Sequence, residues 1–446
     1  MTPSATRALA FDVALATGVF GLKILVSVLL LRLGFRQISD DDYARVVIAQ
    51  TFANTPRLDP SGTSWLPFPF WMTGSAMLVL GRSLAVARGV ALVASALASA
   101  MVFVVLRRSG APRSAALLAT LAASLVPWAA WSGACPVPEG FAGPLVAVGV
   151  FSLLAAKGDS AGGARTLAWG AGALAIAALS RYETWPACAC FAAAAVHRAR
   201  RDGHLPRVVG PLAISLAAPV AWVAWNQYAH GDALHFLARV TRFRQAHGDA
   251  GVDTWARLSS VPRALWAASP ESVVAGLALA WLALRDRRLR WPLLTAAAIV
   301  TFLIVGELGD GAPTHHRERA LLAIPYLMLG GLACGCAPEV GASERLPRAH
   351  VYARRTAGLV VAATWLVNLP SLARDFPGTG AADRTTQVAR GTALRALSPE
   401  GFAVSPCAFE HFALMAAYGA PERVRVAAAP GPREPAEECP KISPGR

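Results

Sequence analysis

The feature that most constrains this chain is a series of long apolar segments separated by short arginine-rich connections. An α-helix needs about 20 consecutive apolar residues to cross the hydrocarbon core of a bilayer, and residues 8–33 are long enough to do so. Hydrophobic residues make up 55% of the 446 residues and charged residues only 15%, a balance that excludes a water-soluble protein of this size. We therefore predict an all-α polytopic membrane protein.

The apolar pattern predicts about 11 transmembrane helices, within a range of about 10 to 13. The first, residues 8–33, is expected to be a retained anchor, because it is too long for the apolar part of a cleaved signal peptide. Residues 66–81 are ambiguous, since they form either a further span or a re-entrant or surface helix. The other predicted spans are residues 89–106, 114–131, 140–156, 166–180, 185–196, 208–227, 272–284, 291–305, 320–336 and 357–369.

The formal net charge of +15 comes mainly from arginines gathered between the apolar segments. Positive residues collect in the cytoplasmic loops of membrane proteins, so this charge does not indicate nucleic-acid binding. The basic connections all fall on the cytoplasmic side if residues 66–81 do not cross the membrane. That topology predicts a transmembrane domain over residues 1–370, with a first outer loop at 34–66, and a small extracytoplasmic tail over 371–446.

Three consecutive carboxylates, Asp40, Asp41 and Asp42, follow the first span directly. Carboxylates beside lipid are costly and usually serve solvation or chemistry. A local alternative is that Ser39 caps a short surface helix, with Asp42 at the capping-box position. Capping needs one acid rather than three, and residues 65–71 add the aromatic rings and prolines of a stiff loop in the headgroup zone. The pattern therefore predicts an extracytoplasmic site in this loop.

A second polar cluster, Arg181, Tyr182 and Glu183, lies at a predicted corner between two spans. An Arg-x-Glu pair is suited to orient a phosphate or a hydroxyl group. The alternative is an interfacial anchor, in which the arginine snorkels and the aromatic ring lies in the headgroup belt. Glu139 begins another span, where a helix N-terminus favours a carboxylate for structural reasons.

A third cluster, His315, His316, Arg317 and Arg319, precedes the span at 320–336. These side chains supply fixed donors and positive charge at a helix N-terminus, which suits a phosphate or diphosphate leaving group. A zinc site is disfavoured because adjacent histidines rarely bind one ion together and no third ligand has suitable spacing. A basic loop flanking the membrane is the structural alternative.

The cysteines fall into two groups. Cys407 and Cys439 stand alone in the polar tail, where an oxidising compartment would allow a disulfide between them. The other five are expected to pack in or beside spans as small apolar residues: Cys135, Cys188, Cys190, Cys334 and Cys336. The tail also carries apolar residues that could form a small core: Phe402, Val404, Phe409, Phe412, Leu414, Met415 and Tyr418.

In their order and sidedness these motifs resemble the GT-C superfamily of polytopic glycosyltransferases, which includes protein O-mannosyltransferases and the lipid A aminoarabinose transferase. The acidic motif followed by Tyr43, the Arg-Tyr-Glu-x-Trp corner and the late His-x-Arg loop carry the resemblance, over residues 11–369. The chain departs from the common pattern in having Asp-Asp-Asp in place of Asp-Glu, and Glu318 where such enzymes often place a tyrosine. These departures leave the catalytic aspartate and the donor lipid open.

The resemblance implies an enzyme of the bacterial inner membrane that transfers a sugar from a polyprenyl-phosphate donor to a lipid, glycan or protein acceptor on the extracytoplasmic face. One of Asp40, Asp41 and Asp42 would be the general base. The resemblance implies no definite cofactor and leaves open whether the enzyme uses a divalent cation. No nucleic-acid partner is expected. The substrate-binding positions would be Tyr43, Glu139, Arg181, Tyr182, Glu183, His315, His316, Arg317 and Arg319.

The competing interpretation is a polytopic transporter or lipid flippase of envelope polysaccharide assembly, and a third is a non-catalytic assembly factor. Transport predicts ionisable residues deep within spans. Here the spans contain few of them apart from Asp12, Lys23 and Arg32 in the first. The sequence therefore favours the enzyme.

Overall fold

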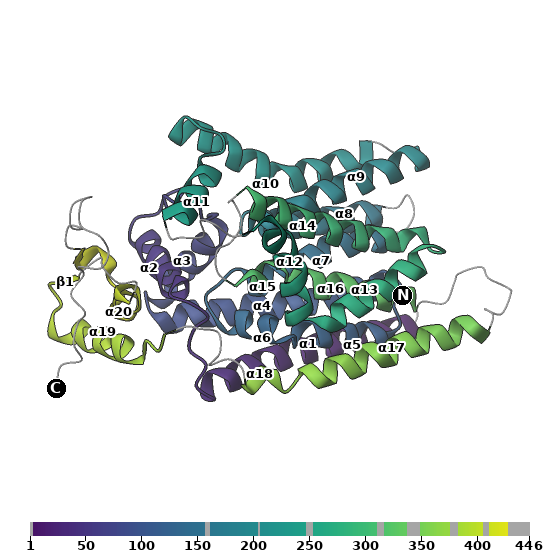
Figure 1. Cartoon of the computed structure of the whole chain (residues 1–446), viewed down its shortest axis with the longest axis horizontal. Helices are drawn as coiled ribbons and strands as arrows, with labels where there is room; N and C mark the ends of the chain where they lie inside the picture. Colours follow the sequence, from purple (N-terminus) through teal and green to yellow (C-terminus); the bar gives the residue numbers. More distant parts are fainter. Residues whose placement is uncertain are drawn as a thin grey trace. The chain divides into compact units, whose positions relative to one another are not determined.

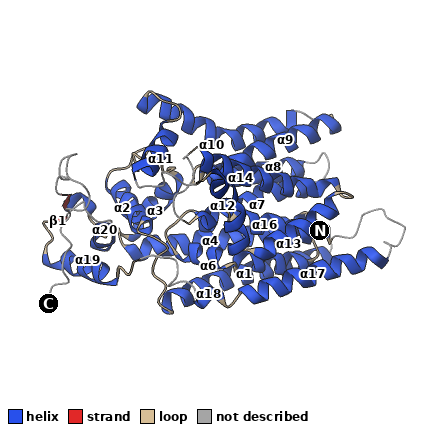
Figure 2. Cartoon of the chain, in the orientation of Figure 1, coloured by secondary structure: helices blue, strands red, loops and turns tan. Residues whose placement is uncertain are grey.

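The computed structural model describes residues 3–156, 161–203, 206–246, 253–309, 316–336, 348–374, 382–404 and 410–426. The regular structure of the described chain is helical (Figure 2) apart from two three-residue strands, β1 (Phe402–Val404) and β2 (Val424–Val426), which pair in parallel. Its contacts divide it into two compact units. The first comprises Met1–Phe35, Ser61–Pro69 and Ala91–Phe376, and the second comprises Arg36–Pro60, Phe70–Val90 and Pro377–Arg446.

Within the described residues, four of the helices labelled in Figure 1 are long and apolar enough to cross a membrane by themselves. They are α1 (Pro3–Arg32), α4 (Leu84–Arg108), α10 (Pro206–His230) and α14 (Arg290–Leu308). Two bent helix pairs raise the number to as many as six: α5 (Arg113–Ser124) with α6 (Pro127–Ala134), and α12 (Thr254–Ala268) with α13 (Pro270–Ala283).

The remaining helices of the first unit are shorter. Every predicted span overlaps a helix, whereas the total of about 11 crossings and their sidedness stay predictions. These helices are α7 (Glu139–Ala155), α8 (Ala161–Ala178), η1 (Tyr182–Thr184), α9 (Trp185–Asp202), α11 (His235–Ala246), η2 (Arg287–Leu289), α15 (Arg317–Ala320), α16 (Ala323–Gly335), α17 (Arg348–Asn368) and α18 (Ser371–Arg374).

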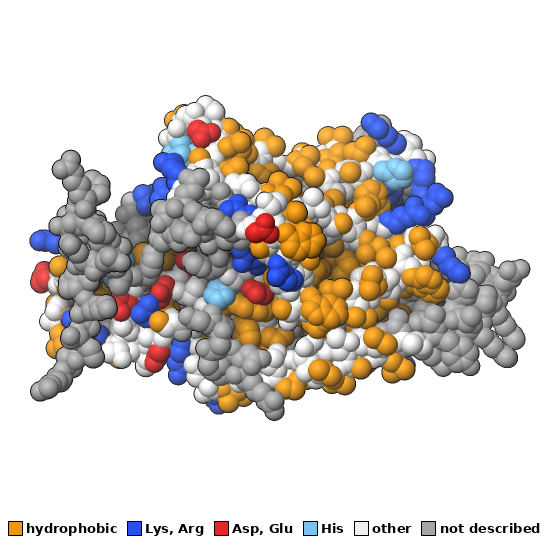
Figure 3. Space-filling model, in the orientation of Figure 1, with side chains coloured by type: hydrophobic (Ala, Val, Ile, Leu, Met, Phe, Trp, Pro, Cys, Tyr) orange, Lys and Arg blue, Asp and Glu red, His pale blue; other side chains and the backbone are white. Residues whose placement is uncertain are grey.

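Large apolar side chains are exposed along several of these helices. Val220 of α10, Leu277 of α13 and Val305 of α14 are each more than half exposed, and Figure 3 shows hydrophobic side chains spread across one face of the molecule. Water disfavours such a surface, whereas lipid does not. Together with the long apolar helices, this surface identifies an integral membrane protein.

The predicted span at 114–131 is two helices, α5 and α6, which meet at an angle of 70°. Pro127 causes the break, because proline lacks a backbone N–H and keeps Val126 before it in an extended conformation (φ −52°, ψ 132°). Lys23 of α1 is 2% exposed and donates hydrogen bonds to the carbonyls of Ser124 (2.9 Å) and Ala129 (2.8 Å). The lysine in the first span therefore satisfies carbonyl groups on both sides of a helix break.

Small residues allow α7, α8 and α16 to pack closely, as is common for membrane helices. A Cβ atom at Gly143 of α7 would lie 2.9 Å from the backbone carbon of Leu322, just before α16. Likewise, a Cβ atom at Gly330 of α16 would lie 2.7 Å from the ring of Phe151 in α7. These close approaches place the N-terminus of α7 beside the start of α16.

The second unit joins segments from both ends of the chain. Its helices are α2 (Asp41–Asn54), α19 (Thr385–Leu397), α20 (His411–Tyr418) and η4 (Pro421–Arg423), together with residues 70–80 of α3 (Phe68–Leu80) and 84–90 of α4. α3 has 13 residues and is about 20 Å long, shorter than a hydrocarbon core of about 30 Å. A helix of this length does not cross a bilayer unaided.

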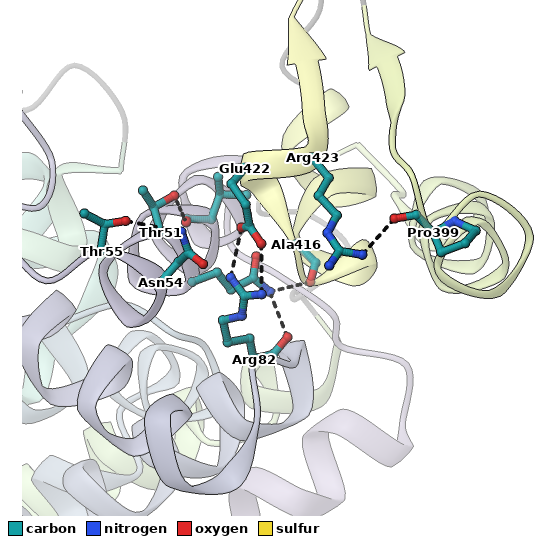
Figure 4. Close-up of polar contacts among 10 residues, drawn as sticks. Thr51, Asn54, Thr55, Arg82, Pro399, Ala416, Glu422 and Arg423 are labelled. Carbon is teal, nitrogen blue, oxygen red and sulfur yellow. Dashed lines mark hydrogen bonds and ion pairs between the residues drawn. The ribbon is translucent and has the colours of Figure 1, made fainter.

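One hydrophobic core holds the second unit together. Residues of α2, including Tyr43 and Val46, pack in it with Met415 and Tyr418 of α20. Gln50 of α2 adds a hydrogen bond from its amide nitrogen to the carbonyl of Ala416 (2.8 Å), and Figure 4 shows the polar contacts around Arg82 and Glu422 in the same unit. Described apolar residues of the tail thus share a core with the helix that carries the acidic motif, whereas Phe409 lies outside the described residues.

Candidate active site

Glu139 is the centre of a buried charge cluster in the first unit. It begins α7 and is 1% exposed. Its Oε1 atom lies 3.1 Å from Nη1 of Arg181 and 3.2 Å from Nη2 of Arg319. Two arginines therefore neutralise one desolvated carboxylate, which a buried ion requires. The cluster brings together residues from all three sequence regions expected to bind substrate in this unit.

The corner between α8 and α9 holds Arg181 in place. The Nε atom of Arg181 donates to Oε1 of Glu183 (2.7 Å), so that the guanidinium group joins two carboxylates, Glu139 and Glu183. The side chain of Arg181 is only 14% exposed. Because Arg-x-Glu spans the single turn η1, the short spacing in the sequence is what allows the two side chains to pair.

Tyr182 has a different role at the same corner. Its hydroxyl donates to the carbonyl of Ser64 (2.7 Å) and accepts from Nε1 of Trp222 (2.9 Å). Its ring stacks on Phe236 with centroids 4.6 Å apart and packs edge-on against Trp185. Tyr182 therefore ties the segment at 61–69 to the corner through an aromatic cluster.

The loop before α16 carries the third group of predicted residues. His316 has a left-handed conformation (φ 54°, ψ 65°), which no other non-glycine residue of the described chain adopts. Such a conformation is strained for a residue with a Cβ atom and is concentrated at functional sites. The imidazole lies 5.2 Å from the ring of Trp128, measured between centroids. His315 lies outside the described residues.

Arg317 and Arg319 are held by different glutamates. Arg317 donates from Nε and Nη2 to the two carboxylate oxygens of Glu307, at 2.8 and 3.2 Å. Glu307 is 1% exposed at the end of α14 and was not predicted, although a buried acid in an otherwise apolar span is a signal that the sequence offered. The side chain of Arg317 is 34% exposed and that of Arg319 is 6% exposed. Arg317 is therefore the more accessible to a ligand.

The acidic motif belongs to the second unit, where its three carboxylates have different surroundings. α2 begins at Asp41, and the preceding Asp40 already has helical angles (φ −63°, ψ −21°). Asp42 is 1% exposed, and its Oδ2 atom accepts a hydrogen bond from the backbone N–H of Ile38 (2.8 Å). Asp42 thus closes the start of the helix, but at Ile38 rather than at the Ser39 expected for a capping box, because the helix begins later.

Asp40 pairs with an arginine that the sequence analysis missed. The Nε and Nη2 atoms of Arg384 donate to Oδ1 and Oδ2 of Asp40, at 2.8 and 2.7 Å. These hydrogen bonds hold the pKa of Arg384 above its ordinary value. Tyr43, the next predicted residue of the motif, is 2% exposed in the hydrophobic core. Nothing in the sequence singles out Arg384, which is far away along the chain.

Two further predictions concern a disulfide in the tail and a metal site. Cys407 and Cys439, the predicted disulfide pair, both lie outside the described residues. Within them, no group of three or more His, Cys, Asp or Glu side chains is placed to hold a metal ion. Of the remaining cysteines, Cys135, Cys188 and Cys334 are buried, as the predicted packing role requires, whereas Cys190 is half-buried and Cys336 is exposed.

No protein-family model and no curated protein matches this chain. Solved structures do match it over nearly its whole length. The oligosaccharyltransferase of Archaeoglobus fulgidus, in complex with Zn and sulfate, is similar with a TM-score of 0.53 and 14% identity, over 92% of this chain and 62% of that one. In complex with an inhibitory peptide and a dolichol-phosphate, the oligosaccharyltransferase AglB from that organism gives 0.50 and 13%, over 93% and 64%.

The structure of ArnT from Cupriavidus metallidurans in the apo state is similar with a TM-score of 0.50 and 15% identity, over 94% of this chain and 76% of that one. The similarity confirms the predicted resemblance to the GT-C fold, whereas the number of membrane crossings stays a prediction. The chain spans less than two thirds of the archaeal oligosaccharyltransferase.

Proposed function

We propose that this chain is a membrane glycosyltransferase that moves a sugar from a polyprenyl-phosphate donor to an acceptor at the extracytoplasmic face of a bacterial inner membrane. The observation that carries the proposal is the cluster of Glu139, Arg181 and Arg319, because it gathers three motifs at one place in a GT-C fold. A protein of this fold, the archaeal oligosaccharyltransferase, has been solved with a dolichol-phosphate, which supports a polyprenyl-phosphate donor.

In the proposed reaction, an oxygen or nitrogen atom of the acceptor attacks the anomeric carbon of the sugar. The bond from that carbon to the lipid phosphate breaks, the acceptor's proton passes to a carboxylate, and the negative charge remains on the phosphate. The carboxylate is an aspartate of the first outer loop, with Asp40 and Asp41 as the candidates. Asp42 is less suited, because it is buried and accepts the N–H of Ile38.

The departing lipid phosphate needs cationic hydrogen-bond donors that are already in position. Arg317 and Arg319 would supply them, with Arg181 and His316 beside them. Each arginine is oriented by a buried glutamate, Glu307 or Glu139. Fixed guanidinium groups lose little conformational freedom on binding an anion, and their planar forks match the geometry of phosphate oxygens.

The remaining predictions belong to the same proposal. Residues 1–370 would form the catalytic domain, and residues 371–446 would form an extracytoplasmic tail closed by a disulfide between Cys407 and Cys439. The acceptor would be a lipid, a glycan or a protein, and a divalent cation stays open as a cofactor. Tyr43, Tyr182, Glu183 and His315 complete the proposed substrate-binding residues.

The direct test is to incubate the purified protein in detergent with radiolabelled polyprenyl-phosphate sugars and to measure label that leaves the lipid. The proposal expects release by the wild-type protein and loss of release in the Arg317→Ala variant. A matched control is Arg288→Ala, which removes an arginine of the same unit that pairs with Asp286 and is not among the proposed substrate-binding residues. Label that crosses a proteoliposome membrane while still on its lipid would instead support the flippase.

A further inference from the structure

The C-terminal segment supplies the partner of the acidic motif. Arg384 lies just before α19 and places two donor atoms, Nε and Nη2, on the two oxygens of Asp40. The side chains are 14% and 26% exposed, so that the pair is largely shielded from water. A bidentate pair of this kind fixes the direction of a carboxylate as well as its charge.

Other residues of the C-terminal segment hold the side chain of Arg384 in place. Its Nη1 atom lies 3.4 Å from Oε2 of Glu410, and the same carboxylate oxygen accepts from Nε2 of Gln387 (3.3 Å). Asp383 accepts from the backbone N–H and the hydroxyl of Thr385, which fixes the chain at the start of α19. The guanidinium group is therefore anchored through several contacts within the C-terminal segment.

We infer that Arg384 is a positioning residue for the acidic motif, which holds the Asp40 carboxylate in one orientation and fixes the first turn of α2. The inference rests on the proposed function, in which this motif supplies the base. Consecutive helical residues point about 100° apart, so fixing Asp40 also sets the direction of Asp41. Asp40 then anchors the motif, Asp42 closes the helix start, and Asp41, which is partly exposed, accepts the proton.

A second arginine pair in the same unit serves as a control that separates positioning by Arg384 from a purely stabilising role. Arg82 forms a similar fork with Glu422, with Nη1 and Nη2 each 2.9 Å from a carboxylate oxygen (Figure 4). This pair also joins the C-terminal segment to an earlier part of the chain, but it does not contact the acidic motif. Substitution of Arg82 therefore measures how much a bidentate arginine–carboxylate pair contributes to the stability of this unit.

The experiment compares Arg384→Gln, Arg384→Lys and Arg82→Gln in the full-length protein. Hydrogen–deuterium exchange of peptides covering residues 36–45 is measured first, because it needs no substrate. We expect exchange in Arg384→Gln to rise by roughly tenfold or more, as for loss of a charged hydrogen bond. Exchange of these peptides should rise less in Arg384→Lys, and in Arg82→Gln it should equal that of the wild type. Equal exchange in all three variants would overturn the inference.

Sugar release from radiolabelled polyprenyl-phosphate donors is measured second. For Arg384→Gln we expect kcat to fall by roughly tenfold or more, with the KM for the donor unchanged, since positioning affects the reacting geometry rather than donor binding. An unchanged kcat beside an active wild type would overturn the inference. If the wild type releases no label, the proposed function fails, and the exchange measurement still decides whether Arg384 orders the motif.

Discussion

The two arginine–carboxylate clusters, one in each unit, differ in burial and in origin. Glu139 is 1% exposed and has two arginine partners, both from the first unit. Asp40 is 26% exposed and has one arginine partner, Arg384 of the C-terminal segment, which contacts both of its carboxylate oxygens. A fully buried cluster cannot lose a member without leaving a buried charge, whereas a partly exposed carboxylate can be hydrated when its partner is removed. We therefore expect the loss of one member to lower the free energy of unfolding more in the first cluster than in the second.

The largest effect on stability should come from Glu139→Gln, which leaves Arg181 and Arg319 facing a neutral side chain. We expect a loss of about 3–5 kcal/mol of unfolding free energy, as for breaking other buried ion pairs. Thermal unfolding in detergent checks this, with Glu422→Gln as the matched control, because its partly exposed pair should contribute only about 0–1 kcal/mol. Equal midpoints for the two variants would remove the contrast between the clusters.

The next largest effect concerns the tail of the second unit. A disulfide between Cys407 and Cys439 would close a loop of about 32 residues and contribute about 3–4 kcal/mol on the chain-entropy model. Mass spectrometry of unreduced protein should find the two cysteines linked, and Cys407→Ser should lower the unfolding temperature. Thiols at both positions that react with a reagent added from the cytoplasmic side would contradict the disulfide and the outer placement of the tail.

A smaller effect should follow from Arg317→Ala, the substitution of the most exposed arginine of the first unit's clusters. We expect donor affinity to fall by roughly 10- to 100-fold, the size of a lost hydrogen bond to a charged group. Arg317→Lys should restore only part of it, because a lysine cannot form a bidentate contact. Donor binding measured with a polyprenyl phosphate would decide, and full affinity in Arg317→Ala would mean that the arginine only flanks the membrane.

The smallest effect is expected for Asp42→Asn. The asparagine oxygen can still accept the N–H of Ile38, so the loss of stability should be about 1 kcal/mol or less. Transfer should survive this change better than it survives Asp40→Asn or Asp41→Asn. A complete loss of transfer in Asp42→Asn, with normal unfolding, would move the base to the buried carboxylate.

The helices and the polar corners could be predicted from the sequence because their signals are local. Apolar runs located every helix that the analysis expected as a span, and Arg181 with Glu183 pair across one short turn. The break at Pro127 was not predicted, because the apolar run over residues 114–131 indicated a single span. The part played by Lys23 at that break could not be foreseen, since it depends on which helix packs against α5 and α6.

The partners of the charged residues could not be predicted, because they are set by tertiary contacts. Glu307 and Arg317 are separated by a loop, and Arg384 reaches Asp40 from the far end of the chain. The apolar residues of the tail were expected to form a small core, and the core in which Met415 and Tyr418 lie also contains Tyr43 and Val46 of α2, which the sequence did not indicate. The apolar pattern indicates that a residue is buried, but it does not indicate which residues it packs against.

The central claim is tested most directly by the Asp40→Asn/Asp41→Asn double variant in the sugar-release assay, beside the wild type and Asp42→Asn. The account predicts that the double variant loses transfer by roughly 10²- to 10⁴-fold, the usual contribution of a general base, while protein level and donor binding persist. Full transfer by the double variant would contradict the assignment of the base to the acidic motif.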